Sequence, residues 1–149
     1  MKVHWLALLL IIGAALSVPV VSAKIVEEKD GYRVMTGTDT IKLPDLSSLS
    51  SSSITQGETH WYSTLVSSGR TAFYSGLNWG NPSNSLSLTI IAPDSSLGPY
   101  YDSSDGAFDG RISLKIVKTA GLSAGTWWSD VYGYSVAGSQ TYSYTAYAV

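Results

Sequence analysis

Hydrophobic and polar side chains alternate in several short segments of this chain. The clearest segment is residues 85–92, where Leu86, Leu88 and Ile90 alternate with serine or threonine. A period of two is typical of a β-strand with one buried face. The same alternation marks residues 60–66, 71–77, 111–117, 126–136 and 139–148. Turn-forming residues separate these segments, and no helical apolar period follows residue 23. The pattern predicts an all-β protein, a jelly-roll-like antiparallel β-sandwich of about seven or eight strands.

The first 23 residues have the features of an export signal. Lys2 precedes an apolar run over residues 5–16, Pro19 interrupts the run, and the small residues Ser22 and Ala23 end it. This order predicts a signal peptide over residues 1–23 that is cleaved after Ala23. The alternative is an uncleaved membrane anchor, because about 20 apolar residues can span a bilayer. Both readings place the rest of the chain outside the cytoplasm, secreted or at the cell surface.

The remaining chain is divided by a serine-rich stretch. Residues 32–35 and 40–43 are candidate short strands, but residues 46–53 show no periodicity and read as a linker or exposed loop. We therefore expect an N-terminal segment and linker over residues 24–53 and a compact domain over residues 54–149.

Charge and cysteine content narrow the classes of partner. Without Lys2 the chain has eight basic and eleven acidic residues and no basic patch, so nucleic acid is not an expected partner. There is no cysteine, so an exported domain of this size must be stabilised by its core or by a bound ion. The expected partner is an extracellular protein or a polysaccharide.

An acidic loop offers the one candidate metal site. Asp102, Asp105 and Asp109 lie within eight residues beside two glycines, and calcium prefers six to eight oxygen ligands on a flexible loop. Asp94 or Asn78 could complete such a shell. The spacing is not that of an EF-hand, and Asp-Gly pairs are also common in turns. The alternatives are therefore a calcium ion that orders the loop and a turn without an ion.

A second candidate site lies in residues 126–136. In a strand, Trp128, Tyr132 and Tyr134 share a face with Asp130, while Trp127 and Val131 share the other. Exposed aromatic rings beside polar groups can stack on sugars or anchor a protein partner. The alternative is that these rings only cover the sheet. Trp79 is expected to pack and hold its loop.

Catalytic residues are not expected. His60 is the single histidine after residue 23, so a Ser-His-Asp arrangement would have to use it. Zinc lacks ligands, since one histidine remains after residue 23 and the sequence has no cysteine. A small secreted hydrolase is the weakest alternative, and we expect that the protein is not an enzyme.

Four stretches within residues 55–145 resemble a known family. They are Gln56-Gly57-Glu58 with Trp61-Tyr62-Ser63; Leu77-Asn78-Trp79 with the leucine-rich segment and Ala92-Pro93-Asp94; Ala124-Gly125-Thr126-Trp127 with Val131-Tyr132-Gly133; and Tyr142-Ser143-Tyr144-Thr145. They resemble the bacterial and archaeal pre-peptidase C-terminal domain, a β-sandwich related to collagen-binding domains.

The resemblance implies a non-catalytic accessory module that acts in secretion or attachment, stabilised by calcium in some relatives. This chain has Ser85 or Ser87 where the family usually has an aspartate in the central strand, so any function of that aspartate is in doubt here. From the sequence we expect an exported accessory or binding module. The alternative is a carbohydrate-binding module that uses Trp128, Tyr132 and Tyr134.

Overall fold

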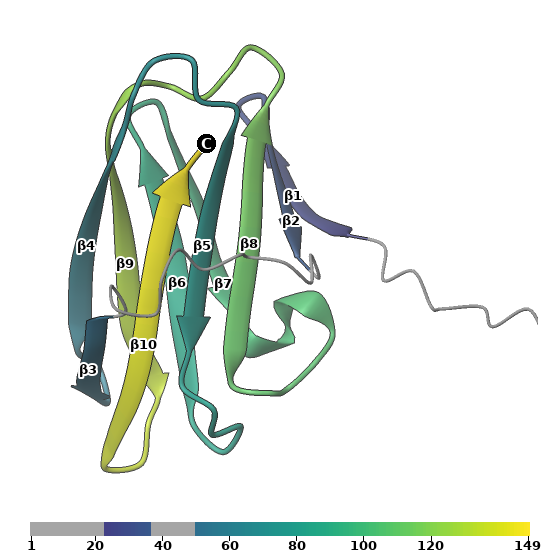
Figure 1. Cartoon of the computed structure of the whole chain (residues 1–149). Helices are drawn as coiled ribbons and strands as arrows, with labels where there is room; N and C mark the ends of the chain where they lie inside the picture. Colours follow the sequence, from purple (N-terminus) through teal and green to yellow (C-terminus); the bar gives the residue numbers. More distant parts are fainter. Residues whose placement is uncertain (1–22, 37–49) are drawn as a thin grey trace, which may run out of the picture.

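The computed structural model describes residues 23–36 and 50–149. These residues form ten β-strands and a short 3-10 helix (Figure 1). The elements are β1 (Lys24–Lys29), β2 (Tyr32–Thr36), β3 (Ser50–Thr55), β4 (Thr59–Val66), β5 (Ala72–Asn78), β6 (Ser85–Ala92), β7 (Ser95–Tyr101), the 3-10 helix Asp102–Asp105, β8 (Arg111–Lys118), β9 (Gly125–Ser135) and β10 (Ser139–Ala148).

The strands form two facing antiparallel sheets. One has six strands in the order β1-β2-β8-β5-β10-β3, and the other has four in the order β4-β9-β6-β7. The predicted all-β sandwich is confirmed, although ten strands in the described residues exceed the seven or eight expected. Within these residues no helix has the length and apolar character needed to cross a membrane.

The core lies between the sheets and contains the residues that the alternation places on one face. Leu86, Leu88 and Ile90 of β6 have no exposed surface, and Leu114 and Ile116 of β8 are equally buried. Burying one such side chain stabilises the fold by about 1.5–3 kcal/mol. The predicted inner faces of these strands are therefore correct.

The predicted domain boundary at residue 54 is wrong. Strands β1 and β2 form a hairpin through Asp30 and Gly31, and β2 pairs with β8 inside the six-stranded sheet. Tyr32 and Val34 of this hairpin belong to the hydrophobic core. Residues 24–36 are thus part of the sandwich, because β2 extends the six-stranded sheet beyond β8 and Tyr32 packs against Trp127 of the facing sheet.

The serine-rich stretch is also not simply a linker. Its end forms β3, which pairs with β10, and Ile54 is fully buried. This strand gives no alternation of apolar and polar residues in the sequence, because its first four residues are all serine. The predicted strand at residues 40–43, the start of the serine-rich stretch and the signal segment over residues 1–22 lie outside the described residues.

Polar side chains join the two sheets at one end and along one side. Tyr32 donates a hydrogen bond to Asp94 (2.6 Å), which also accepts one from Lys118. The hydrogen bond from Lys118 is the main cause that holds the pKa of Asp94 below its usual range. Along the side, Glu27 of β1 accepts hydrogen bonds from Tyr100 and from the Gly98 amide of β7. The hairpin is therefore attached by polar contacts as well as by its core residues.

The boundary correction gives a test. A chain that begins at residue 50 loses Tyr32 and Val34 from the core, about 4 kcal/mol of burial. We expect it to melt about 10–20 °C below a chain that begins at residue 24, as measured by circular dichroism. Equal melting temperatures for the two chains would show that the hairpin is dispensable.

Candidate functional site

The outer face of the four-stranded sheet carries the predicted aromatic residues. Along β9, Trp127 and Val131 are fully buried, whereas Trp128 and Tyr134 are 44% and 52% exposed. Tyr132 lies between them and is half-buried. The structure therefore brings the three predicted binding residues onto one surface, and the assignment of the two faces of β9 is confirmed.

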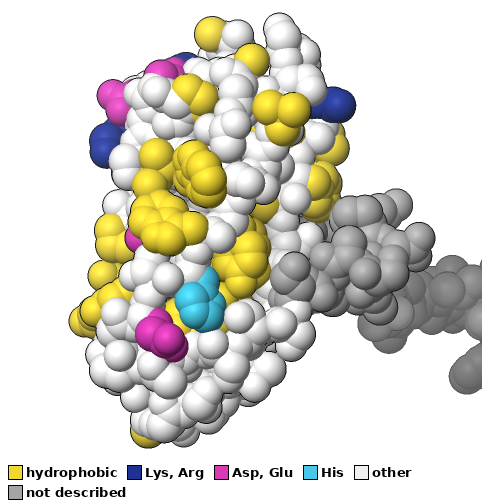
Figure 2. Space-filling model, turned by 90° about the vertical axis from the view of Figure 1, so that its left-hand side faces the viewer, with side chains coloured by type: hydrophobic (Ala, Val, Ile, Leu, Met, Phe, Trp, Pro, Cys, Tyr) yellow, Lys and Arg dark blue, Asp and Glu magenta, His cyan; other side chains and the backbone are white. Residues whose placement is uncertain are grey.

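Neighbouring strands extend this surface. Trp61 of β4 is 54% exposed and lies directly opposite Asp130 of β9. Tyr101 of β7 packs edge-on against Tyr134, with ring centroids 4.9 Å apart. We call the surface formed by these side chains the aromatic face; its members are Trp61, Tyr101, Trp128, Tyr132 and Tyr134. Figure 2 shows hydrophobic side chains gathered on the side of the molecule where β4 lies.

The sequence alone does not single out Trp61 and Tyr101. Trp61 lies on the opposite side of its strand from Tyr62 and Val66, so the alternation in residues 60–66 contains the signal that it faces outward. Tyr101 gives no such signal, because Gly98 and Pro99 interrupt its strand.

Asp130 occupies the middle of the aromatic face. It lies opposite Trp61 on one neighbouring strand and opposite Thr89 on the other, with Trp128 and Tyr132 two residues away along β9. Its Oδ1 atom is buried and accepts no hydrogen bond from the described residues. Burial raises the pKa of this carboxyl group, because a desolvated carboxylate is less stable than a hydrated one. The face thus holds a carboxylate oxygen that no described residue hydrogen-bonds.

The aromatic face ends in a shallow pocket next to the acidic loop. The pocket has a volume of about 300 Å³ and is lined by Ser85, Tyr101, Asp102, Ser103, Phe108 and Tyr134. Phe108 is 73% exposed at its rim. The pocket joins hydroxyl groups to aromatic rings, and it places the two sites predicted from the sequence next to each other.

In the acidic loop, the Asp102 side chain binds the backbone. One of its carboxylate oxygens accepts hydrogen bonds from the amides of Asp109 (3.1 Å), Gly110 (3.1 Å) and Arg111 (3.3 Å), and the other accepts from Gly110 (3.0 Å). Asp102 is 4% exposed. A buried carboxylate that receives several amide hydrogen bonds is well satisfied. Asp102 therefore closes the loop on itself.

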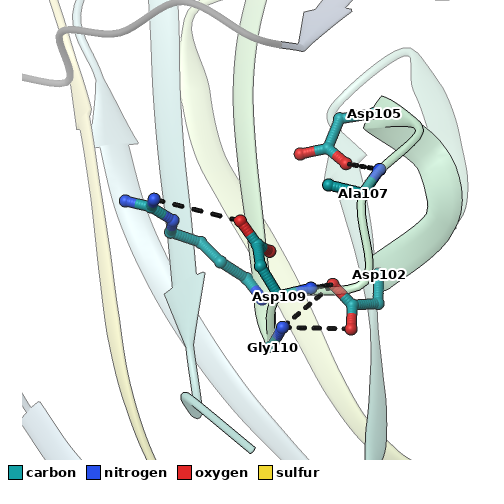
Figure 3. A network of polar contacts seen from close by, with 6 residues as sticks. Asp102, Asp105, Ala107, Asp109 and Gly110 are labelled. Carbon is teal, nitrogen blue, oxygen red and sulfur yellow. Dashed lines mark hydrogen bonds and ion pairs between the residues drawn. The ribbon is translucent and has the colours of Figure 1, made fainter. Parts of the chain in front are cut away.

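The other two aspartates have different partners. Asp105 accepts a hydrogen bond from the Ala107 amide (2.9 Å), and Asp109 lies 4.0 Å from the guanidinium group of Arg111. Figure 3 shows the three carboxylates directed at these separate partners. In the described part of the chain, no group of three or more Asp, Glu or His side chains is arranged to hold a metal. The structure does not bring the predicted ligands Asp102, Asp105 and Asp109 together, and calcium binding stays a prediction.

The Asp102 hydrogen bonds position a second loop. The carbonyl group of Gly110 accepts hydrogen bonds from the amides of Trp79 (2.9 Å) and Gly80 (3.1 Å). Gly110 has φ 74°, and a Cβ atom there would lie 2.8 Å from the Asn81 nitrogen. Only glycine fits this approach. Trp79 is 6% exposed and donates to the Asn84 carbonyl group, as expected for a residue that holds its loop.

His60 faces the space between the sheets. Its Nδ1 atom lies 2.7 Å from the hydroxyl group of Tyr142 and 3.4 Å from that of Ser52. The Tyr142 hydroxyl group also contacts that of Tyr62 at 2.6 Å. These contacts join the four-stranded sheet to β3 and β10. The absence of catalysis stays a prediction.

The role of Asp102 is testable. We expect Asp102→Ala to lower the free energy of unfolding by about 3 kcal/mol, because four hydrogen bonds to a charged group are lost. Asp105→Ala removes one exposed hydrogen bond and should change it by less than about 1 kcal/mol. Urea unfolding, run with calcium and with EDTA, measures both.

Unfolding with calcium and with EDTA distinguishes a hydrogen-bonded turn from a calcium site. A loss that is equal with and without calcium supports the hydrogen-bonded turn. A calcium-dependent gain in stability that Asp105→Ala abolishes would instead establish the calcium site. Equal stability of Asp102→Ala and the unmodified chain would contradict a stabilising role for the hydrogen bonds to Asp102.

Comparison with known proteins gives a partial match. No family model matches the chain, so the resemblance to the pre-peptidase C-terminal domain stays a prediction. A 43-residue segment is 54% identical to a protein of Archaeoglobus fulgidus described as uncharacterized. The match covers 29% of this chain and 59% of that protein.

Proposed function

We propose that the protein is an exported, non-catalytic binding module that takes a polysaccharide on its aromatic face. The observation that carries this proposal is the set of exposed aromatic rings around Asp130. Trp61, Trp128 and Tyr134 are each about half exposed on the outer face of one sheet. Exposed apolar groups that lie together, rather than singly, mark interaction sites.

The shape and chemistry of the face suit sugars. A sugar ring presents apolar C–H faces and a rim of hydroxyl groups. Aromatic rings can pack on the apolar faces, and they lose little side-chain entropy on binding. The sheet holds these rings in fixed positions, because each lies on a strand rather than on a mobile loop.

Polar groups on the same face provide hydrogen bonds to the hydroxyl rim. Asp130 has a desolvated carboxyl group whose Oδ1 atom has no donor among the described residues, and a sugar hydroxyl group would supply one. Ser85 and Ser103 line the adjoining pocket. The length of the surface, from Trp61 on β4 to the pocket beyond Tyr134, favours a chain of several sugars over a single one.

Removing a ring tests the site. We expect Trp128→Ala to weaken binding to a responsive polysaccharide about 10- to 30-fold, because a central aromatic contact contributes about 2 kcal/mol. Pull-down with insoluble cellulose, chitin, xylan and mannan identifies the responsive polymer, and calorimetry with its soluble oligomers measures the affinity.

The opposite sheet provides a matched control. Tyr74 stacks on Tyr147 with ring centroids 5.1 Å apart, on the outer face of the six-stranded sheet. Tyr74→Ala should leave polysaccharide binding unchanged. If no polysaccharide binds, or if the two variants weaken binding equally, the proposal fails; binding to collagen that requires Trp128 would assign the face to a protein ligand instead.

Asp130 gives a prediction in which stability and binding change in opposite directions. Its raised pKa means that the folded state holds the proton more tightly than the unfolded state. The contribution of this group to stability therefore falls as pH rises through the interval between its unfolded and folded pKa values. Asp130→Asn removes that penalty, so at neutral pH we expect an unchanged or slightly higher melting temperature.

Binding should respond with the opposite sign. The ionised carboxylate accepts stronger hydrogen bonds than an amide oxygen, so Asp130→Asn should weaken binding about tenfold. In the unmodified protein, binding should weaken as pH falls through the Asp130 pKa, and the variant should lack this dependence. Titration calorimetry at several pH values measures it, and an identical pH profile in the two proteins would rule out contact between Asp130 and the ligand.

A further inference from the structure

Strand β4 forms an edge of the four-stranded sheet. It is eight residues long, and among the described strands it pairs with β9 alone. An edge strand exposes a row of unpaired amide and carbonyl groups, and proteins usually protect such edges with lysine, proline or a bulge. Strand β4, Thr59–Val66, has none of these features and no charged residue.

The other edges are protected or less apolar. Strand β1 has Lys24 and Lys29 at its ends and a register shift in its middle. Strand β7 contains Pro99 and faces a register shift in β6. Strand β3 is serine-rich, with Ile54 turned into the core. By contrast, β4 exposes two large apolar side chains, Trp61 at 54% and Leu65 at 75%.

We propose that β4 is a self-association edge, on which a second copy of this chain pairs its own β4 in antiparallel orientation around a twofold axis at Ser63. This inference rests on the free edge of β4 and not on polysaccharide binding, and the two proposals share Trp61. It assigns an interaction surface that joins two four-stranded sheets into one.

The hydrogen-bonding pattern selects this register. The Gly133 amide donates to the Glu58 carbonyl group, so the even-numbered residues of β4 direct their backbone groups toward β9. Backbone direction alternates along an antiparallel strand. The odd-numbered residues, including Trp61, Ser63 and Leu65, therefore direct their amide and carbonyl groups to the free edge, as pairing with a second strand requires.

The side chains are self-complementary in the same register. With Ser63 opposite Ser63 of the second copy, Trp61 lies opposite Leu65 of that copy, and the reverse pair forms across the axis. Directly opposite residues of an antiparallel pair contact each other on one face of the sheet. Each exposed apolar side chain of β4 is thus covered by the other, as an interface with twofold symmetry demands.

Charge is also complementary along the edge. Glu58 precedes β4 and Arg70 follows it. Antiparallel pairing places the acidic end of one strand beside the basic end of the other. Parallel pairing would bring like charges together.

The oligomeric state tests the proposal on the chain from residue 24 to residue 149. Sedimentation velocity over a range of concentrations should show a monomer–dimer equilibrium in the micromolar range, since a strand-pair interface is small. Leu65→Lys should raise the dissociation constant of the dimer at least tenfold. Ile25→Lys changes another exposed aliphatic residue on the edge strand β1, and the dimer should persist.

Cross-linking tests the register, because the chain has no cysteine. Ser63→Cys should be joined to its own copy by a short bismaleimide. Thr59→Cys should not be cross-linked. In this register the two Thr59 residues are offset by eight residues along the strands, which is about 27 Å. A chain that stays monomeric at millimolar concentration, a dimer that is insensitive to Leu65→Lys, or preferential linking at Thr59→Cys would each overturn the proposal.

Discussion

The position of Trp127 between the two sheets determines the rest of the structure. This fully buried ring stacks on Phe73 with centroids 4.7 Å apart and meets Tyr32 edge-on at 5.7 Å. Both partners belong to the six-stranded sheet, so Trp127 ties the sheets together. Because side chains alternate along a strand, a fixed Trp127 sends Trp128 and Asp130 outward. The aromatic face is thus a direct consequence of core packing, and it cannot shift by one residue without exposing Trp127.

The sequence predicted the strands whose alternation carries large core residues. Strands β6, β9 and β10 have such residues at every second position, and their faces were assigned correctly. Strands β1, β3 and β7 were missed because each is rich in Lys, Ser or Gly-Pro and, unlike the edge strand β4, has no clear alternation. An edge strand is defined by what it pairs with, and local composition does not contain that information. The hairpin residue Tyr32 shows the same limit, since its contacts with Trp127 and Asp94 join segments that lie far apart in the sequence.

The acidic loop shows why proximity in sequence is a weak guide to a metal site. Asp102, Asp105 and Asp109 suggest a ligand set by number and spacing, but hydrogen bonds compete for each carboxylate. The amides of Asp109, Gly110 and Arg111 converge on Asp102 and give it the positive partial charges that a cation would have supplied. The backbone course that directs these amides depends on the left-handed Gly110 and its contact with the neighbouring loop. The sequence marks this loop as special, but only the folded backbone shows how its charges are used.

Asp130 differs from the other polar residues that the fold encloses. Ser75 and Ser129 share hydrogen bonds with Tyr144, Asn84 is paired with Gln140, and Asp102 is bonded to amides. In the part of the chain that the structure describes, the Thr36 hydroxyl group and Asp130 Oδ1 are the two buried side-chain atoms without a partner. An unpaired carboxylate at this depth lowers stability, and a threonine like Thr89 beside it would fit the strand better. Its place among the exposed aromatic side chains is the reason that we propose a ligand as the source of the missing hydrogen bond.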